Sequence, residues 1–173
     1  MSDWGERVGH ALKWVQPHAL KMEYELQEAG ERLATLRFRS SLGSLATAEC
    51  GAGCWTFKRV GFWQTKATIR ECGAGPDLAA FRNNTWENGG TLVLADGRQY
   101  PANTNFWMTE FEFATEAGAS LVQYFQIGGL LHLSAQVRIQ PAAADLAELP
   151  WLVALGCYLI VMLHQDAAAA AAA

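Results

Sequence analysis

Residues 149–163 read Leu-Pro-Trp-Leu-Val-Ala-Leu-Gly-Cys-Tyr-Leu-Ile-Val-Met-Leu and contain no charged side chain. A helix that is apolar on every side must be buried all round, either by protein or by lipid. The run is longer than the roughly 10–14 residues of a core helix and shorter than the 18 or so that indicate a membrane span. Because the rest of the chain is patterned like β-structure, we expect this helix to fill the inside of a β-barrel.

Ahead of this stretch, apolar and polar residues alternate in one short run after another, with turn residues between the runs. Residues 131–139 show the pattern most clearly, with apolar side chains at odd positions and polar ones at even positions. Asp96-Gly97 is a hairpin signal, because glycine accepts the positive φ of a type I′ turn. The same alternation places Trp107, Phe111 and Phe113 on one face. Evenly spaced runs of this kind predict an all-β sandwich or barrel.

The count of strand-like runs, about ten to twelve, selects the architecture. A closed sheet has no unpaired edge, and a barrel of that size has an interior too wide for its own side chains to fill. The fold class predicted is therefore mainly β, a closed antiparallel barrel of about 12 strands around a buried C-terminal hydrophobic α-helix.

The chain length fits one domain. We expect a lead segment at residues 1–19, a barrel at residues 20–166 with its central helix at residues 146–165, and a poly-Ala tail at residues 167–173. Pro150 suits the first turn of the helix, where no amide donor is needed. The alanines of the tail either prolong the helix or fray into solvent.

The charge balance excludes an extended nucleic-acid surface. The formal net charge is −4, and Lys and Arg do not cluster as phosphate binding requires. Residues 1–14 have no continuous apolar core, so a secretory signal is not indicated and a cytoplasmic location is expected.

The cysteines lie in a repeated motif, Glu49-Cys50-Gly51-Ala52-Gly53 and Glu71-Cys72-Gly73-Ala74-Gly75. Both copies are predicted to be glycine-bearing turns. Cys54 follows the first copy, but a fourth ligand at zinc-finger spacing is missing, and we expect neither a metal nor a cofactor. A disulfide between Cys50 and Cys72 fits the sequence, although it would be unusual in a reducing cytosol. Cys157 is expected to act as a small hydrophobe in the helix.

Six segments along the chain resemble a known family, and the resemblance lies mainly in the order of strands and terminal helix. The segments are Arg37-Phe38-Arg39-Ser40 and residues 55–63, 81–86, 102–107, 128–134 and 149–151. Together they resemble bacterial members of the tubby C-terminal-like superfamily, which also includes phospholipid scramblases and LURP-one-related proteins. The resemblance runs from about residue 20 to residue 164. It implies a twelve-stranded barrel around a C-terminal hydrophobic helix. The basic phosphoinositide pocket of tubby proteins and the calcium-binding and lipidation segments of scramblases have no counterpart in this sequence. What the resemblance implies is therefore the fold, together with the general expectation of a lipid-related role.

The sequence does not contain a recognisable catalytic constellation. Glu110 and Glu112 share a strand face, but that face has the polar parity of a wet exterior. His132 lies beside Ser134 without a third partner, and His164 suits the C-terminal end of the helix dipole. We expect a protein that is not an enzyme.

The loop Asn83-Asn84-Thr85-Trp86-Glu87-Asn88 is polar and carries a tryptophan, a composition shared by binding loops and plain turns. The candidate ligand-binding residues are Asn83, Asn84, Trp86, Asn105 and Trp107. Three functions remain open. The first is a non-catalytic binding or adaptor module for a lipid headgroup, a nucleotide or another protein. The second is a membrane-associated β-domain with the helix as a tail anchor, and the third is a small-molecule carrier or an enzyme with an open lumen.

Overall fold

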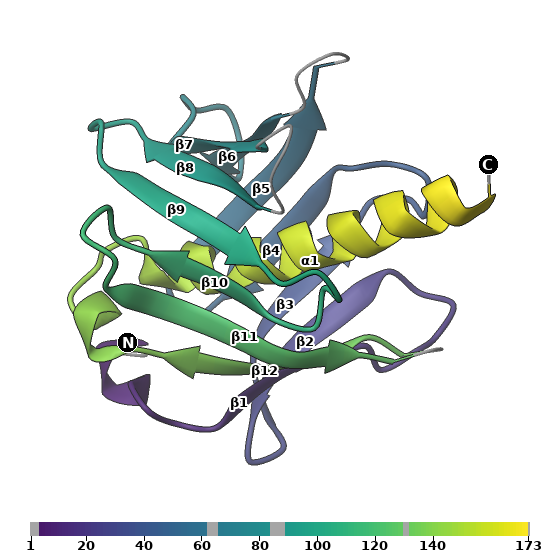
Figure 1. The fold of residues 1–173 in the computed structure, drawn as a ribbon, viewed down its shortest axis with the longest axis horizontal. Helices are drawn as coiled ribbons and strands as arrows, with labels where there is room; N and C mark the ends of the chain where they lie inside the picture. Colours follow the sequence, from purple (N-terminus) through teal and green to yellow (C-terminus); the bar gives the residue numbers. More distant parts are fainter. Residues whose placement is uncertain (1–3, 62–65, 84–88, 130–131, 173) are drawn as a thin grey trace.

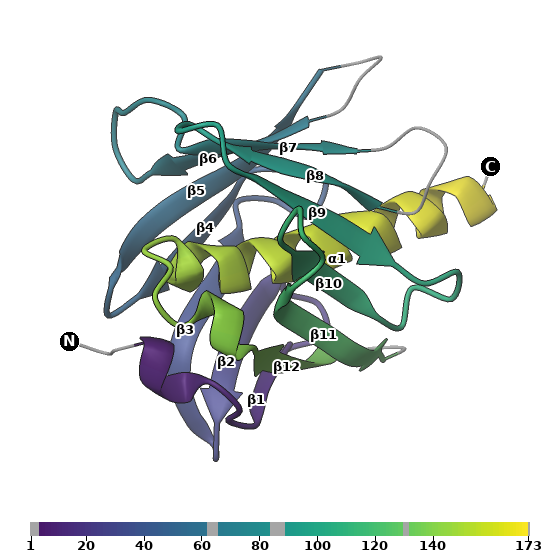
Figure 2. The same ribbon diagram turned by 60° about the vertical axis from the view of Figure 1, so that its left-hand side comes forward.

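A computed structural model describes residues 4–61, 66–83, 89–129 and 132–172, and these residues form one closed barrel around a long helix (Figures 1 and 2). Each strand pairs antiparallel with its neighbour in the chain, and β1 pairs with β12 to close the sheet. The predicted fold class is confirmed. The strands are β1 (Leu12–Val15), β2 (Glu23–Glu28), β3 (Glu31–Phe38), β4 (Ala46–Cys50), β5 (Gly53–Val60), β6 (Lys66–Glu71), β7 (Ala79–Asn83), β8 (Gly89–Leu94), β9 (Gln99–Thr104), β10 (Phe111–Ala114), β11 (Ser120–Gly128) and β12 (Ser134–Ile139).

The helix α1 (Leu149–Ala172) passes through the barrel and is buried on all sides over most of its apolar run (Figure 1). Pro150 is its second residue. Gly156 permits a close approach to the wall, because a Cβ at this position would lie 2.1 Å from the Tyr124 ring. The hydroxyl of Tyr124 donates to the carbonyl of Val153 over 2.8 Å and so fastens β11 to the helix backbone.

The inner face of the wall alternates as the sequence predicts. Phe57 on β5 lies opposite Ile69 on β6, and both side chains are fully buried against the central core. Burying one large apolar side chain contributes roughly 1.5–3 kcal/mol. Burial of the many apolar side chains of α1 therefore contributes a free energy comparable to the whole net stability of a domain, about 5–15 kcal/mol.

Two predicted boundaries differ from the structure. The barrel begins before residue 20, because β1 (Leu12–Val15) pairs with both β2 and β12 and buries Leu12 and Trp14. This strand has four residues, too few to give a clear period of two in the sequence. The helix begins at Leu149 instead of residue 146 and continues through the alanines to Ala172, in keeping with their high helix propensity.

The two ends of the barrel differ, and we name them by the course of α1. The base is the end where α1 begins, and it carries the connections that follow even-numbered strands, among them residues 29–30, 51–52, 72–78, 95–98 and 115–119. The exit end is the end where α1 emerges, and it carries the connections that follow odd-numbered strands. The C-terminal turns of α1 project from the exit end (Figures 1 and 2).

An ion pair between a buried carboxylate and an exposed arginine lies at the base. Glu148, 5% exposed at its side chain, accepts a hydrogen bond over 2.7 Å from Arg98 and another from the hydroxyl of Tyr100. Burial, reinforced by the Glu148 carboxylate, raises the pKa of Tyr100, so that its hydroxyl keeps the proton it donates. The residue just ahead of α1 is thereby tied to the β8–β9 hairpin.

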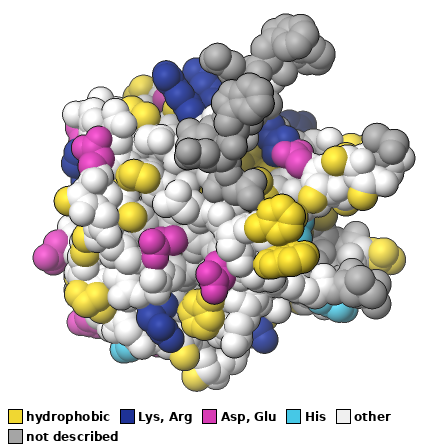
Figure 3. Space-filling view, in the orientation of Figure 1, with side chains coloured by type: hydrophobic (Ala, Val, Ile, Leu, Met, Phe, Trp, Pro, Cys, Tyr) yellow, Lys and Arg dark blue, Asp and Glu magenta, His cyan; other side chains and the backbone are white. Residues whose placement is uncertain are grey.

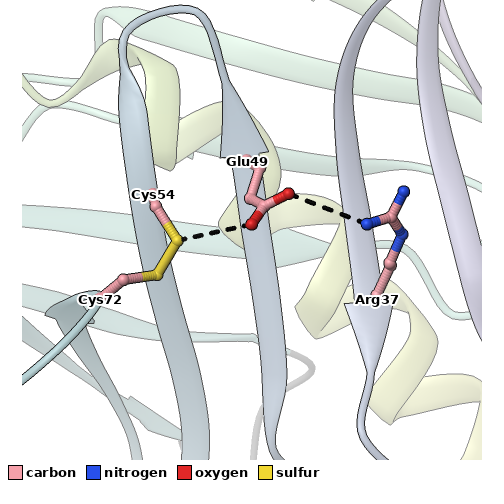
Figure 4. The surroundings of a disulfide bond; sticks show 4 residues. All are labelled: Arg37, Glu49, Cys54 and Cys72. Atoms are coloured by element: carbon pink, nitrogen blue, oxygen red, sulfur yellow. Dashed lines mark hydrogen bonds and ion pairs between the residues drawn. A yellow bond between two sulfur atoms is a disulfide. The ribbon is translucent and has the colours of Figure 1, made fainter.

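A disulfide also lies at the base, and it joins Cys54 to Cys72 instead of Cys50 to Cys72 (Figure 4). The reason is register: Cys50 lies opposite Gly53 in the β4–β5 hairpin, whereas the amide of Cys72 donates to the carbonyl of Cys54 just past the end of the β5–β6 ladder. The two Cα atoms are 5.4 Å apart, a normal separation for a disulfide. Cys50 and Cys157 are free thiols.

Candidate functional site

The exit end includes the connection between β9 and β10, which is held by a network of side-chain hydrogen bonds. Asn105 organises it. Its side-chain oxygen accepts from the amides of Thr109 and Glu110 over 2.8 and 3.1 Å, and its side-chain amide donates to the Thr109 hydroxyl over 2.7 Å. The amide of Met108 in turn donates to the Asn105 carbonyl. The loop is therefore held in shape by its own hydrogen bonds.

This loop presents two large aromatic side chains to solvent. Phe106 is 78% exposed and Trp107 is 76% exposed. Their rings meet edge to face with centroids 5.1 Å apart, so that the pair acts as one unit. The prediction that Trp107 shares the inner face with Phe111 and Phe113 is wrong. Trp107 lies in the turn that precedes β10, and strand parity does not extend into a turn.

Two other connections at this end expose leucine. Leu20, between β1 and β2, is 98% exposed, and Leu42, between β3 and β4, is 99% exposed. Among the described residues, the large hydrophobic side chains that are exposed are these two and the aromatic pair, and all four lie at the exit end. Figure 3 shows hydrophobic side chains beside the projecting part of α1. We call Leu20, Leu42, Phe106 and Trp107 the apolar tips.

Basic side chains lie on the outer wall at the same end (Figure 3). Lys66 and Arg82 stand directly opposite each other on β6 and β7, both exposed, and Lys58 lies on the neighbouring strand. Like charges directly opposite in a sheet repel each other. Within the described part of the chain, none of these three side chains has an acidic partner. We call Lys58, Lys66 and Arg82 the basic corner.

The emerging helix is fastened to the wall by polar contacts. Arg59 on β5 binds Asp166 through two hydrogen bonds of 2.9 and 3.0 Å. The hydroxyl of Tyr158 donates to the carbonyl of Ser44 over 2.6 Å. Burial raises the pKa of Tyr158 to about 12, so the hydroxyl remains a donor at neutral pH. These contacts fix the position of α1 relative to the loops around it.

The structure brings three of the predicted ligand-binding residues to the exit end. Asn83 ends β7 and lines a narrow cleft between α1 and the wall, together with Lys66 and Met162. Asn105 shapes the β9–β10 loop, and Trp107 is one of the apolar tips. Asn84 and Trp86 lie outside the described residues.

Sequence reasoning missed Phe106, Leu20, Leu42 and the basic corner. The first three could have been noticed as large apolar residues within turn-like segments, where a period of two gives them no inner face. The basic corner could not, because its members come from three strands and only the register places Lys66 beside Arg82.

Of the other polar residues considered for catalysis, Glu112, His132 and His164 have structural partners. Glu112 accepts from Gln123 over 2.7 Å and from Ser120 over 2.9 Å. The Nδ1 atom of His132 lies 2.7 Å from the Gln16 carbonyl, and that of His164 lies 2.9 Å from the Ile160 carbonyl. In the part of the chain that the structure describes, His, Cys, Asp and Glu side chains do not form a group of three that could hold a metal.

A wider hollow lies on the outer wall over β9–β12. Its volume is about 560 Å³, and Asn103, Glu110, Glu112, Gln123 and Arg138 are among the residues that line it. The guanidinium of Arg138 lies 5.0 Å from the centre of the Phe125 ring. The hollow is open and polar.

Comparison with protein-family models, curated proteins and solved structures gives no match. By length and composition α1 is able to cross a membrane, and most of its apolar stretch is buried inside the barrel.

Proposed function

We propose that this protein is a non-catalytic binding module and that the exit end of the barrel is its binding surface. The observation that carries the proposal is the one-sided distribution of the apolar tips. Single exposed hydrophobic residues are normal on a protein surface, but here all four such residues among those described lie at one end, which supports an interaction site there. The neighbouring basic corner and the ordered β9–β10 loop support the same assignment.

The family assignment is part of the proposal. We infer that the chain is a member of the tubby C-terminal-like superfamily. The sequence segments that resemble this superfamily support the membership, and so do the twelve strands and the buried C-terminal helix. The lipid-related role that the resemblance implies is compatible with a binding surface that is apolar and basic.

The alternatives fit less well. A tail anchor would require α1 to leave the barrel, and the Tyr124, Arg59 and Tyr158 contacts would then be lost. A carrier with an open lumen has no room, because α1 occupies the interior. A small ligand would instead have to bind in the polar hollow over β9–β12, which is within the usual size range of ligand pockets, about 300–1,000 Å³.

The proposal is tested by photo-crosslinking in cells, which captures a partner whatever its chemical class. A photoreactive amino acid replaces Phe106 in one variant and Ala117, an exposed residue of the base, in a matched control. We expect crosslinked species from position 106 and none from position 117. Equal crosslinking at both positions, or none at position 106, would contradict a binding surface at the exit end.

A further inference from the structure

We propose that the exit end docks end-on onto an anionic lipid bilayer, with the apolar tips in the interfacial layer and the basic corner against the headgroups. This inference rests on the proposed function of the exit end and names its partner. It is carried by the nature of the tips, by their arrangement and by the distribution of charge.

The aromatic pair has the chemistry of an interfacial anchor. Tryptophan is enriched where membranes meet water, because its ring is apolar and its N–H is polar. The Asn105 hydrogen bonds hold Phe106 and Trp107 outward before any contact is made. Little conformational entropy is therefore lost when the pair enters the interface.

The arrangement of the tips favours a bilayer over a protein partner. Leu20, Leu42 and the aromatic pair come from three separate connections around the emerging helix. A protein partner would need a matching socket for each tip, since hot-spot residues fill well-packed pockets. A bilayer accepts separate apolar side chains without any matching shape. The alanines that follow Asp166 on the projecting part of α1 add no charge to this end.

The charges favour an anionic surface. Lys66 and Arg82 repel each other across the β6–β7 ladder, and a lipid phosphate or carboxylate would relieve that repulsion. Lys21, which follows Leu20, and Arg39, in the same connection as Leu42, are exposed and also lack an acidic partner among the described residues. Juxtamembrane basic residues of this kind are attracted to anionic leaflets.

The base is acidic where the exit end is basic, and this difference determines which end of the barrel faces the membrane. Most of its arginines are paired with carboxylates: Arg7 with Glu28, Arg70 with Asp77, and Arg98 with Asp96 and Glu148. Its connections include Glu116, Asp77 and Asp96, and small residues fill most of the remaining positions. An acidic end repels an anionic leaflet, so the barrel would dock with the base pointing away from the membrane.

Vesicle co-sedimentation of the full chain tests the inference. Vesicles of phosphatidylcholine with about 30 mol% phosphatidylserine are compared with pure phosphatidylcholine, because the anionic lipid supplies the attraction. We expect binding to the anionic vesicles that weakens as salt is raised. Phe106→Ser with Trp107→Ser should lower the partition coefficient about ten-fold or more. Lys66→Gln with Arg82→Gln should lower it about thirty-fold.

Two controls separate this mechanism from others. Lys13→Gln with Arg32→Gln removes the same charge at the base and should leave vesicle binding unchanged. Phe106→Leu with Trp107→Phe keeps large apolar tips and should retain most of the binding, whereas a shape-matched protein socket would not tolerate it.

The outcomes distinguish the two proposals. Absence of binding to anionic vesicles overturns the bilayer inference, and so does equal loss of binding in the base control. If position 106 nevertheless crosslinks to a protein, the exit end remains a binding surface with a different partner. If position 106 crosslinks to nothing and vesicles do not bind, both proposals fail.

Discussion

The base and the exit end of the barrel differ in whether their charged and apolar side chains have partners. At the base, the buried carboxylate of Glu148 is paired with Arg98 and Tyr100, and a disulfide joins β5 to the chain after β6. At the exit end, Lys66 and Arg82 have no acidic partner among the residues that the structure describes. The rings of Phe106 and Trp107 face solvent there. At the base, the carboxylates of Glu148 and Asp77 are paired with arginines, whereas at the exit end basic and large apolar side chains remain exposed. Features that do not stabilise the fold are thus concentrated where a partner can use them.

The first prediction concerns α1, the element that links the two ends. Leu155 lies near the middle of its apolar run, residues 149–163, and is fully buried. Leu155→Asp should abolish soluble folding, because an unpaired carboxylate inside the barrel costs more than a marginally stable domain can offset. Circular dichroism and gel filtration of the purified variant measure the effect.

A matched control uses the same helix. Ala168→Asp places the identical charge on the exposed part of α1 and should change the free energy of unfolding by less than about 0.5 kcal/mol. A soluble, fully folded Leu155→Asp protein would contradict the burial of α1 inside the barrel.

The second prediction tests the base. Cys54→Ala with Cys72→Ala opens a loop with a sequence separation of 18 and should lower the free energy of unfolding by about 3 kcal/mol. Denaturant titration of the oxidised protein, the reduced protein and the variant measures the loss. The reduced protein should behave like the variant, and Cys50→Ala should behave like the oxidised protein.

The cysteines also bear on location. A cytoplasmic location stays a prediction, and the disulfide weighs against it because such bonds persist mainly in oxidising compartments. If reduction leaves the unfolding transition unchanged, the disulfide contributes nothing to the base.

The sequence was sufficient for the architecture because its two strongest signals are local. An apolar run without a polar face has to be buried, and Gly156 in that run lies in close contact with Tyr124 of the wall. Alternation along residues 131–139 likewise predicts β12 and its inner face. Each signal depends on one segment, so it can be recognised before the strand pairing is established.

The remaining features depend on pairing between distant segments. Whether Cys72 joins Cys50 or Cys54 is decided by the β4–β5 and β5–β6 registers, and the sequence alone leaves both partners open. Leu20 and Leu42 are ordinary loop residues in the sequence. They become a surface only when the antiparallel topology brings their connections to the same end as Trp107.

The last and smallest expected effect concerns the apolar tips. Phe106→Ser with Trp107→Ser should change the free energy of unfolding by less than about 0.5 kcal/mol, because both side chains are exposed and their only described ring contact is with each other. Asn105→Ala is the contrasting variant. It removes the hydrogen bonds that shape the loop and should cost about 1 kcal/mol while the aromatic residues remain. A large loss of stability in the double variant would mean that the rings stabilise the fold, and the exit end would then resemble the base. A negligible loss leaves two exposed aromatic rings without a structural role, as a surface for binding requires.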